Sequence, residues 1–272
     1  MMRTDGNVLH HRQAEAAEGH DAFAALYDPT TIRHLEAVGV RPGWRCWGIG
    51  STSLVSWLAK RVGPTGRVLA TPVDTTWSAP AARPPVEILN HDIASGEPPA
   101  GGFDLVHARL PFVEAADRER AVRAMAAALR PGGHLLIEDT DPELQPLACP
   151  DEHGPGERLA NRLRRGIHEL RTARGQSHAQ SHAQGRVLPR LLRQAGLTEV
   201  TADAYIPYAD PACARLESAT VRLLGDRLLV AGLATAGDIE EHLGNLATGE
   251  LALSAAPLIS ARGRKSQASK VR

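Results

Sequence analysis

The chain has 272 residues, of which 43% are hydrophobic, and its 31 basic and 31 acidic residues give a formal net charge of zero. This size and hydrophobic content suit one α/β domain with appended helices, or one domain with a small cap. The balanced charge gives no reason to expect nucleic acid or an anionic membrane as a partner.

Other compositional features narrow the class of protein further. The chain has three cysteines, Cys46, Cys149 and Cys213, and their odd number and wide spacing suggest neither a disulfide framework nor a zinc ribbon. No apolar run approaches the roughly 20 residues that a membrane helix needs, and the first residues lack the apolar core of a signal peptide. We therefore expect a soluble, cytoplasmic protein with no membrane partner.

Residues 1–40 are expected to be helical. Residues 7–28 carry apolar side chains loosely on one side, as a polar surface helix does. Asp28-Pro29-Thr30 is expected to begin a second helix, because proline suits the first helical turn. Gly39 is expected to end it.

Residues 43–74 predict a strand, a turn, a helix and a second strand. The strands are Arg45 to Ile49 and Arg67 to Thr71, and residues 54–62 between them carry apolar side chains at helical spacing. This order opens a doubly wound α/β domain. The turn that follows the first strand lies where such folds hold a cofactor.

Three more strands are expected before residue 140. The four prolines between residues 72 and 85 exclude a regular crossover helix there. Strands are expected at 86–89, 103–109 and 134–138, with a helix at 117–129 that Arg130-Pro131-Gly132-Gly133 ends. Strands alternating with helices at this spacing predict a parallel sheet with right-handed crossovers.

The remaining residues are expected to be mainly helical. Helices are predicted at 157–172, 188–195, 212–233 and 238–246, and strands at 198–205 and within 251–261. Residues 262–272 are polar and basic and are expected to form a disordered tail.

Four stretches of the sequence match the pattern of a known family. They are GWRC with RVGPTGRVLAT, HDI with FDLVHARL, ALRPGGHLLIED, and LPRLLRQAGL with LISARGR. Together they resemble class I S-adenosylmethionine-dependent methyltransferases, in particular an actinobacterial small-molecule subgroup, over about residues 30 to 264. The resemblance implies a doubly wound, seven-stranded, mostly parallel sheet whose last strand is antiparallel. It also implies N-terminal lid helices at 1–40 and a methyltransferase-like domain at 41–261, with a helical insertion at 157–195 and helices at 212–247.

The resemblance also implies how the cofactor, S-adenosylmethionine (SAM), is held. In this family a glycine-rich loop approaches the methionine part of SAM, and acidic residues after the second and third strands bind the ribose and the adenine. At the loop stand Gly48, Gly50 and Ser51, and at the adenine position stand Asp92 and Ile93. Arg109, after the fourth strand, would lie near the methionine end.

The cofactor motif is degenerate at two places. Relatives carry roughly Leu-Glu-Val-Gly-Ala-Gly-Gly-Gly-Ser where this chain has a run from Trp47 to Ser53 that is about two residues shorter and has no acidic residue. Pro72 stands at the position of the ribose carboxylate, and Asp74 replaces it only if the loop refolds. A hydrogen bond to a carboxylate is worth about 1.5–3 kcal/mol, or roughly 10- to 100-fold in affinity. SAM binding is therefore either weakened or lost.

For methyl transfer an enzyme mainly has to orient SAM and the acceptor, because the sulfonium is already activated. A general base helps when the acceptor is a hydroxyl. Candidates at the carboxyl edge of the sheet are His107, Glu114 and Asp139, with Asp141 nearby. Each has a structural alternative: His107 faces the core, Glu114 begins a helix, and the two aspartates occupy a turn.

Three further features carry weaker hypotheses. The repeated Ser-His-Ala-Gln at 177–184 spaces two histidines by four residues, but no carboxylate or cysteine accompanies them, so we predict no metal site. The arginine-rich segment at 157–172 is either a solvated helix face or a surface for an acidic substrate or carrier protein. Trp77 would fill part of the space that a cofactor normally takes.

Three functions remain open from the sequence. The first is SAM-dependent methyl transfer to a small-molecule acceptor in secondary metabolism. The second is a SAM-independent cyclase or other tailoring enzyme on the degenerate scaffold, and the third is a non-catalytic binding protein, because fold alone does not fix function. A homodimer is the default assembly of soluble enzymes, and no residue argues for it specifically.

Overall fold

The computed structural model describes residues 4–71, 83–91, 93, 97–109, 115–175 and 185–267. These residues divide into two compact units. The sheet unit comprises residues 30–141, 183–205 and 258–272, and the helical unit comprises residues 1–29, 142–182 and 206–257.

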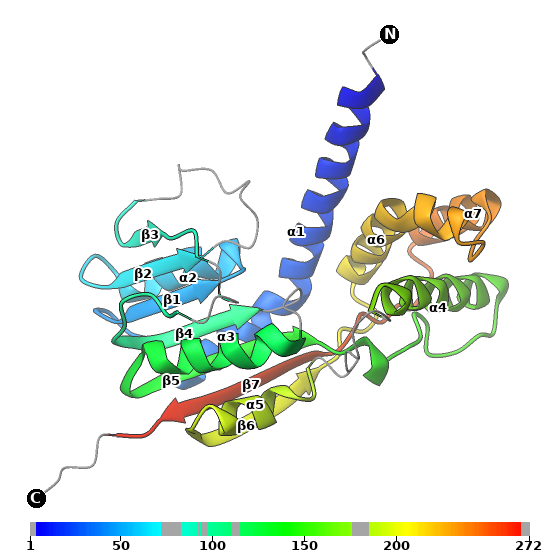
Figure 1. Ribbon diagram of the computed structural model, residues 1–272. Coiled ribbons are helices and arrows are strands. Elements are labelled where there is room, and N and C mark those ends of the chain that lie inside the picture. Colours follow the sequence, from blue (N-terminus) through cyan, green and yellow to red (C-terminus); the bar gives the residue numbers. More distant parts are fainter. Residues whose placement is uncertain are drawn as a thin grey trace, which may run out of the picture. The chain divides into compact units, whose positions relative to one another are not determined.

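The sheet unit is built on a seven-stranded sheet with the order β3-β2-β1-β4-β5-β7-β6 (Figure 1). Strand β7 is antiparallel to β5 and β6, whereas the other neighbouring strands are parallel. The chain moves outward from β1 in one direction and from β4 in the other, so the order reverses between β1 and β4. This is the predicted doubly wound fold. The strands are β1 (Arg45–Ile49), β2 (Arg67–Thr71), β3 (Val86–Ile88), β4 (Phe103–Arg109), β5 (Leu129–Thr140), β6 (Leu197–Tyr205) and β7 (Leu258–Lys265).

Helices cover both faces of this sheet (Figure 1). On one face, α2 (Thr52–Val62) buries Leu58 and Val62 against Cys46 and other strand residues. On the other face, α3 (Ala115–Ala128) and α5 (Leu188–Gln194) bury residues such as Met125 and Leu192. Cys46 is fully buried among apolar side chains.

The helical unit contains α4 (Pro155–Gly175), α6 (Pro211–Val230), α7 (Ala236–Thr248), the short helix η3 (Pro142–Leu144) and the first part of α1 (Thr4–Val38). Its core joins Ile167 of α4 to Val221 and Leu228 of α6, with side chains of α7 packed around them. Helix α7 begins with a reciprocal capping box between Thr235 and Asp238.

The N-terminal region differs from the prediction of two helices. Helix α1 runs without interruption from Thr4 to Val38, with Pro29 inside it. Proline removes one helical hydrogen bond, but Leu26 and Tyr27 before it and Leu35 after it are all buried. Packing on both sides of Pro29 therefore keeps one helix where the local sequence predicts a new start.

Strand β5 is longer than the predicted strand at 134–138, because Arg130-Pro131-Gly132-Gly133 bulges out of the strand instead of ending before it. Phe103 pairs with Leu129 and Leu105 pairs with His134, so the four residues 130–133 lie opposite a single residue of β4. A Cβ on Gly133 would lie 2.8 Å from the carbonyl oxygen of Phe103, so only glycine fits this close approach.

The predicted boundaries also change at the C-terminal end. Strand β7 covers Leu258–Lys265, so the first residues of the expected tail at 262–272 belong to the sheet. The expected helical insertion at 157–195 is divided, because α4 belongs to the helical unit and α5 to the sheet unit. The expected lid at 1–40 is likewise divided at residue 30, and its role as a lid stays a prediction.

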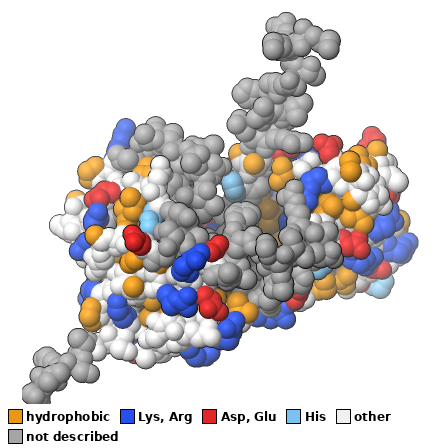
Figure 2. All heavy atoms as spheres, in the orientation of Figure 1, with side chains coloured by type: hydrophobic (Ala, Val, Ile, Leu, Met, Phe, Trp, Pro, Cys, Tyr) orange, Lys and Arg blue, Asp and Glu red, His pale blue; other side chains and the backbone are white. Residues whose placement is uncertain are grey.

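The described surface has mixed charge. Basic and acidic side chains occur side by side on the face drawn in Figure 2, as the zero net charge leads one to expect. Among the described helices, none is both long enough and apolar enough to span a bilayer.

Candidate functional site

The order reversal between β1 and β4 marks the carboxyl edge of the sheet where doubly wound folds bind ligands. Strand β1 ends at Ile49 and α2 begins at Thr52, so only Gly50 and Ser51 connect them. Every residue from Cys46 to Ile49 pairs with both β2 and β4. The strand is therefore fully paired up to Ile49, and the two residues Gly50 and Ser51 form the whole connection to α2.

The two glycines of the motif each have a structural reason. A Cβ on Gly48 would lie 3.0 Å from Cγ2 of Val55, so glycine lets α2 pack closely on β1. Gly50 has a φ of 88°, which favours glycine, and its amide donates to the carbonyl of Thr71 over 3.0 Å. The glycines thus explain the tight turn whether or not a cofactor binds.

The start of α2 keeps donors that suit an anionic group. Ser51 is the N-cap residue, but its side chain makes no capping hydrogen bond, and its hydroxyl lies 3.2 Å from that of Ser53. The first amides of a helix have no partner within the helix, and together with the helix dipole they attract anions. This turn therefore fits the carboxylate end of SAM.

Trp47 occupies the space beside the end of β2. Its fully buried indole donates from Nε1 to Oγ1 of Thr71, the last residue of β2, over 2.9 Å. Its ring lies edge-on to His91 at 5.8 Å and near Phe103 at 6.0 Å between ring centroids. Thr71 is the last described residue before Pro72, which stands at the ribose position of the family. Its hydroxyl oxygen already accepts a hydrogen bond from Trp47. Sequence reasoning considered Trp77 for such a role and not Trp47.

Several predicted site residues lie outside the described part of the chain: Asp74, Asp92, Glu114, Trp77 and the repeat at 177–184. Ile93 is described, and its side chain packs against the core under α3 and α5.

A buried polar network joins His107 and Arg109 of β4 to Glu138 of β5. Glu138 is fully buried, and its Oε2 lies 3.2 Å from Nε2 of His107 and 3.1 Å from Nε of Arg109. Thr31 of α1 donates its hydroxyl to the same oxygen over 2.5 Å, and Ser260 of β7 donates to Oε1 over 2.7 Å. The network therefore ties α1, β4, β5 and β7 together within the sheet unit.

The network keeps Glu138 ionised. Burial alone would raise the pKa of this carboxyl, but the hydrogen bond from His107 and the charge of Arg109 outweigh burial and lower the pKa to about 2. His107 is only 1% exposed and Arg109 only 5%, so both predicted site residues lie in the interior. Sequence reasoning missed Glu138, although a carboxylate directly after the apolar run Leu135-Leu136-Ile137 was a signal for a buried charge.

Two aspartates near this edge, Asp139 and Asp141, are also buried and paired with arginines. Asp139 belongs to β5 rather than to a turn, and its Oδ2 lies 3.2 Å from Nη2 of Arg118 on α3. Burial raises the pKa of Asp139 to about 7 in spite of Arg118. Asp141 accepts from Nε of Arg186 over 2.8 Å. His107 and Arg109 thus share one network around Glu138, whereas Asp139 pairs separately with Arg118 of α3.

A family model described as a methyltransferase domain matches residues 8–202. This chain belongs to the methyltransferase domain family. Its predicted membership of the class I, SAM-dependent methyltransferases is therefore confirmed, and the sheet order is consistent with it. Assignment to an actinobacterial subgroup stays a prediction.

Solved structures with the methyltransferase fold resemble this chain at low sequence identity. Phosphoethanolamine N-methyltransferase 2 of Haemonchus contortus is 12% identical, with a TM-score of 0.53 over 91% of this chain and 57% of its own. A cyclopropane-fatty-acyl-phospholipid synthase-like protein from Lactobacillus casei is 18% identical, with a TM-score of 0.50 over 93% of this chain and 91% of its own. The cyclase SpnF is also 18% identical, with a TM-score of 0.50 over 87% of this chain and 82% of its own.

These identities show the shared fold alone. This methyltransferase-family chain spans little more than half the length of the Haemonchus contortus enzyme. No curated protein sequence matches it.

Proposed function

We propose that this protein transfers a methyl group from SAM to a small-molecule acceptor in secondary metabolism. The observation that carries the proposal is the uncapped start of α2, directly after β1 at the order reversal of a methyltransferase-family sheet. SAM, when bound, supplies the activated methyl group. The protein's part is to bind and orient the two reactants.

In this proposal the turn residues Gly50 and Ser51 and the first amides of α2 bind the carboxylate of SAM. Asp92 and Ile93 are proposed at the adenine, and Asp74 at the ribose. Arg109 is buried and paired with Glu138, so its proposed role is to shape the floor of the methionine end rather than to offer a free charge.

The proposed general bases are His107, Glu114 and Asp139. The pKa of Asp139, raised to about 7, suits a base that works near neutral pH. Its side chain is fully buried beside Arg118, so an acceptor has to reach it from the carboxyl edge of the sheet. His107 would act with its Nε2 held by Glu138.

A second candidate is a SAM-independent tailoring enzyme, such as a cyclase, on the same scaffold. Two observations favour it: the turn after β1 has only two residues, and Trp47 engages the end of β2. SpnF, named as a cyclase, has the same fold, which shows that the fold is compatible with such chemistry.

Calorimetric titration with SAM and with its demethylated product, S-adenosylhomocysteine, separates the two candidates. Binding near micromolar, followed by transfer of labelled methyl groups to an acceptor, supports the first candidate. An absence of binding at millimolar ligand contradicts it, and turnover of a candidate substrate without SAM would then distinguish the second candidate from a non-catalytic binding protein.

A matched pair of glycine variants tests the proposed turn. Gly50→Ala and Gly196→Ala each force a side chain into a positive-φ position, at 88° and 81°. Both should cost a similar, modest amount of stability, on the order of 1 kcal/mol. Only Gly50→Ala should weaken binding of S-adenosylhomocysteine, because only Gly50 lies in the turn that follows β1.

A further inference from the structure

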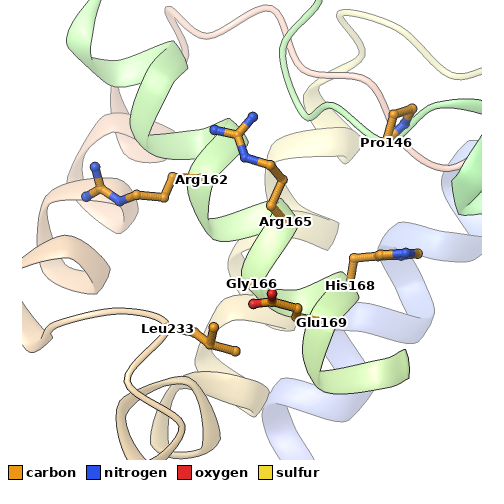
Figure 3. Close-up of a pocket in the computed structure, with 7 residues that line it drawn as sticks. All are labelled: Pro146, Arg162, Arg165, Gly166, His168, Glu169 and Leu233. Carbon is orange, nitrogen blue, oxygen red and sulfur yellow. The ribbon is translucent and has the colours of Figure 1, made fainter. Parts of the chain in front are cut away.

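The helical unit contains a pocket of about 460 Å³ whose described lining residues all belong to this unit (Figure 3). Five lining residues come from α4: Arg162, Arg165, Gly166, His168 and Glu169. Pro146, after η3, and Leu233, between α6 and α7, complete the lining. The volume lies within the range of about 300–1,000 Å³ that is usual for small-molecule sites.

A glycine inside α4 gives the pocket its apolar floor. Glycine within a helix destabilises it relative to alanine, so the presence of Gly166 within α4 calls for a structural explanation. A Cβ at this position would lie 3.3 Å from Cδ2 of Leu228 and 3.3 Å from Cβ of Leu233. The missing side chain thus lets the segment after α6 approach α4, and Leu233 of this segment lines the pocket beside Gly166.

Arg162 and Arg165 are one turn apart on α4, and Figure 3 shows both guanidinium groups extending from this helix. Arg162 donates through Nη2 to Asp238, which forms the capping box of α7 with Thr235. Arg165 donates through Nη1 to Oε1 of Glu152 over a long 3.5 Å. Both arginine side chains are more than half exposed, so these pairs are weak.

Each guanidinium has five N–H donors in a planar fork that matches a carboxylate or a phosphate. The pairs with Asp238 and Glu152 use one nitrogen of each arginine, which leaves N–H donors for a ligand. In the lining the two guanidinium groups outnumber the single carboxylate, that of Glu169. The apolar side chains of Pro146 and Leu233 suit an uncharged part of the same molecule.

We propose that this pocket binds a small molecule that carries a carboxylate or a phosphate together with an apolar portion. Arg162 and Arg165 hold the anionic group, and Leu233, Gly166 and Pro146 contact the apolar portion. Asp238 and Glu152 compete for the same guanidinium groups, so the affinity is moderate. This site goes beyond the proposed methyl transfer, since none of its residues belongs to the proposed cofactor or base residues.

The test is titration of the full-length protein, without SAM, by ligand-observed NMR and calorimetry. The probes are phenyl phosphate, hexanoate and the uncharged hexanol. We expect saturable binding of at least one anion and at least tenfold weaker binding of hexanol. Binding of phenyl phosphate alone identifies a phosphate site, and binding of hexanoate alone identifies a carboxylate site.

Variants on one helix face locate the binding. Arg162→Gln and Arg165→Gln should each weaken binding of the anion at least fivefold. Arg158→Gln is the matched control, because Arg158 is exposed on the same helix, donates to the carbonyl of Glu152 over 3.0 Å and does not line the pocket. It should leave the affinity unchanged.

Two results would overturn the proposal. One is that neither anion binds saturably, and the other is that Arg162→Gln and Arg165→Gln bind the anion as tightly as the control does. Because the titration contains no SAM, its outcome does not depend on whether the sheet unit binds the cofactor.

Discussion

Glu138 accepts hydrogen bonds from four side chains at the carboxyl edge of the sheet. Its two carboxylate oxygens accept from Thr31, His107, Arg109 and Ser260. A buried carboxylate is costly unless such donors surround it, and removing one side of a buried ion pair costs more than the pair contributes.

Glu138→Gln keeps the size of the side chain but removes the negative charge that the buried guanidinium group of Arg109 contacts over 3.1 Å. We expect the free energy of unfolding to fall by about 3–5 kcal/mol, measured by urea denaturation at pH 7. The matched control is Glu87→Gln, because Glu87 pairs with Arg67 over 2.6 Å on the surface. That variant should change stability by less than about 1 kcal/mol. If the two substitutions lower the free energy of unfolding equally, the buried network stabilises the protein no more than the surface pair does.

Asp139 should make stability depend on pH. Its pKa is about 7 in the folded protein and about 3.9 in an unfolded chain. Between these values the folded protein holds a proton that the unfolded chain has released, so the free energy of unfolding falls as pH rises from about 4 to about 7. The slope from this one group is at most about 1.4 kcal/mol per pH unit.

Asp139→Asn removes the titrating group, so its stability should fall less steeply than that of the native protein between pH 5 and pH 7. Urea denaturation at several pH values measures both slopes. Parallel curves for the two proteins would mean that Asp139 does not titrate in this range.

At the scale of elements, the contact between β1 and α2 depends on a glycine. The alanine methyl group in Gly48→Ala would lie 3.0 Å from Val55, so α2 has to shift away from β1. Overpacking of this kind typically costs about 1–3 kcal/mol, measurable as a lower midpoint in urea. Gly244→Ala in α7 is the control, because nothing lies within 4 Å of its new methyl group.

The control should be neutral or stabilising, since alanine favours a helix over glycine by about 1 kcal/mol. Adding Val55→Ala to Gly48→Ala should recover part of the loss by making room for the methyl group. If Val55→Ala lowers the stability of the double variant further instead, Gly48 is not needed for the close packing of α2 on β1.

The elements most accessible from sequence were those with strong local signals. Strands β1 and β2 were predicted at their observed bounds, because apolar strands flank a helix with a clear 3–4 spacing and a Gly-Pro-x-Gly turn. The continuity of α1 was missed because tertiary packing overrides the local effect of Pro29. The bulge in β5 was missed because it depends on pairing with β4.

The candidate site was less accessible from sequence than the fold. His107, Arg109 and Asp139 could be placed at the carboxyl edge from strand order alone. The role of Glu138 could not be predicted, since its partners Thr31 and Ser260 lie more than 100 residues away in sequence and meet it only through the register of β5 with β7 and the packing of α1.

At the scale of the whole molecule, each unit has its own core and its own buried ion pair. In the helical unit, Glu217 of α6 accepts from Nη2 of Arg164 over 2.5 Å, and Nε2 of His242 lies 3.8 Å from its other oxygen. Burial would raise the pKa of Glu217, but the charge of Arg164 and the contact with His242 lower it to about 2.

Because the cores are separate, damage to one unit should stay within it. We expect Glu217→Gln to speed amide hydrogen exchange in residues 155–175 and 211–248, while β1, β2 and β4 keep the protection of the native protein. Glu138→Gln should show the reverse pattern. Faster exchange throughout the chain in either variant would mean that the two units unfold as one cooperative block.

The position of β7 has a consequence for the order in which the protein is made. A ribosome releases β5 and β6 long before β7, yet β6 pairs only with β7, and β5 pairs with β7 along one whole side. Until residues 258–265 emerge, the edge of β5 that faces β7 and the whole of β6 have no strand partner in this sheet, and unpaired strand edges can pair with other chains. Premature termination just before Leu258 should therefore yield aggregates rather than a smaller folded protein, and the newborn chain is a natural client for chaperones.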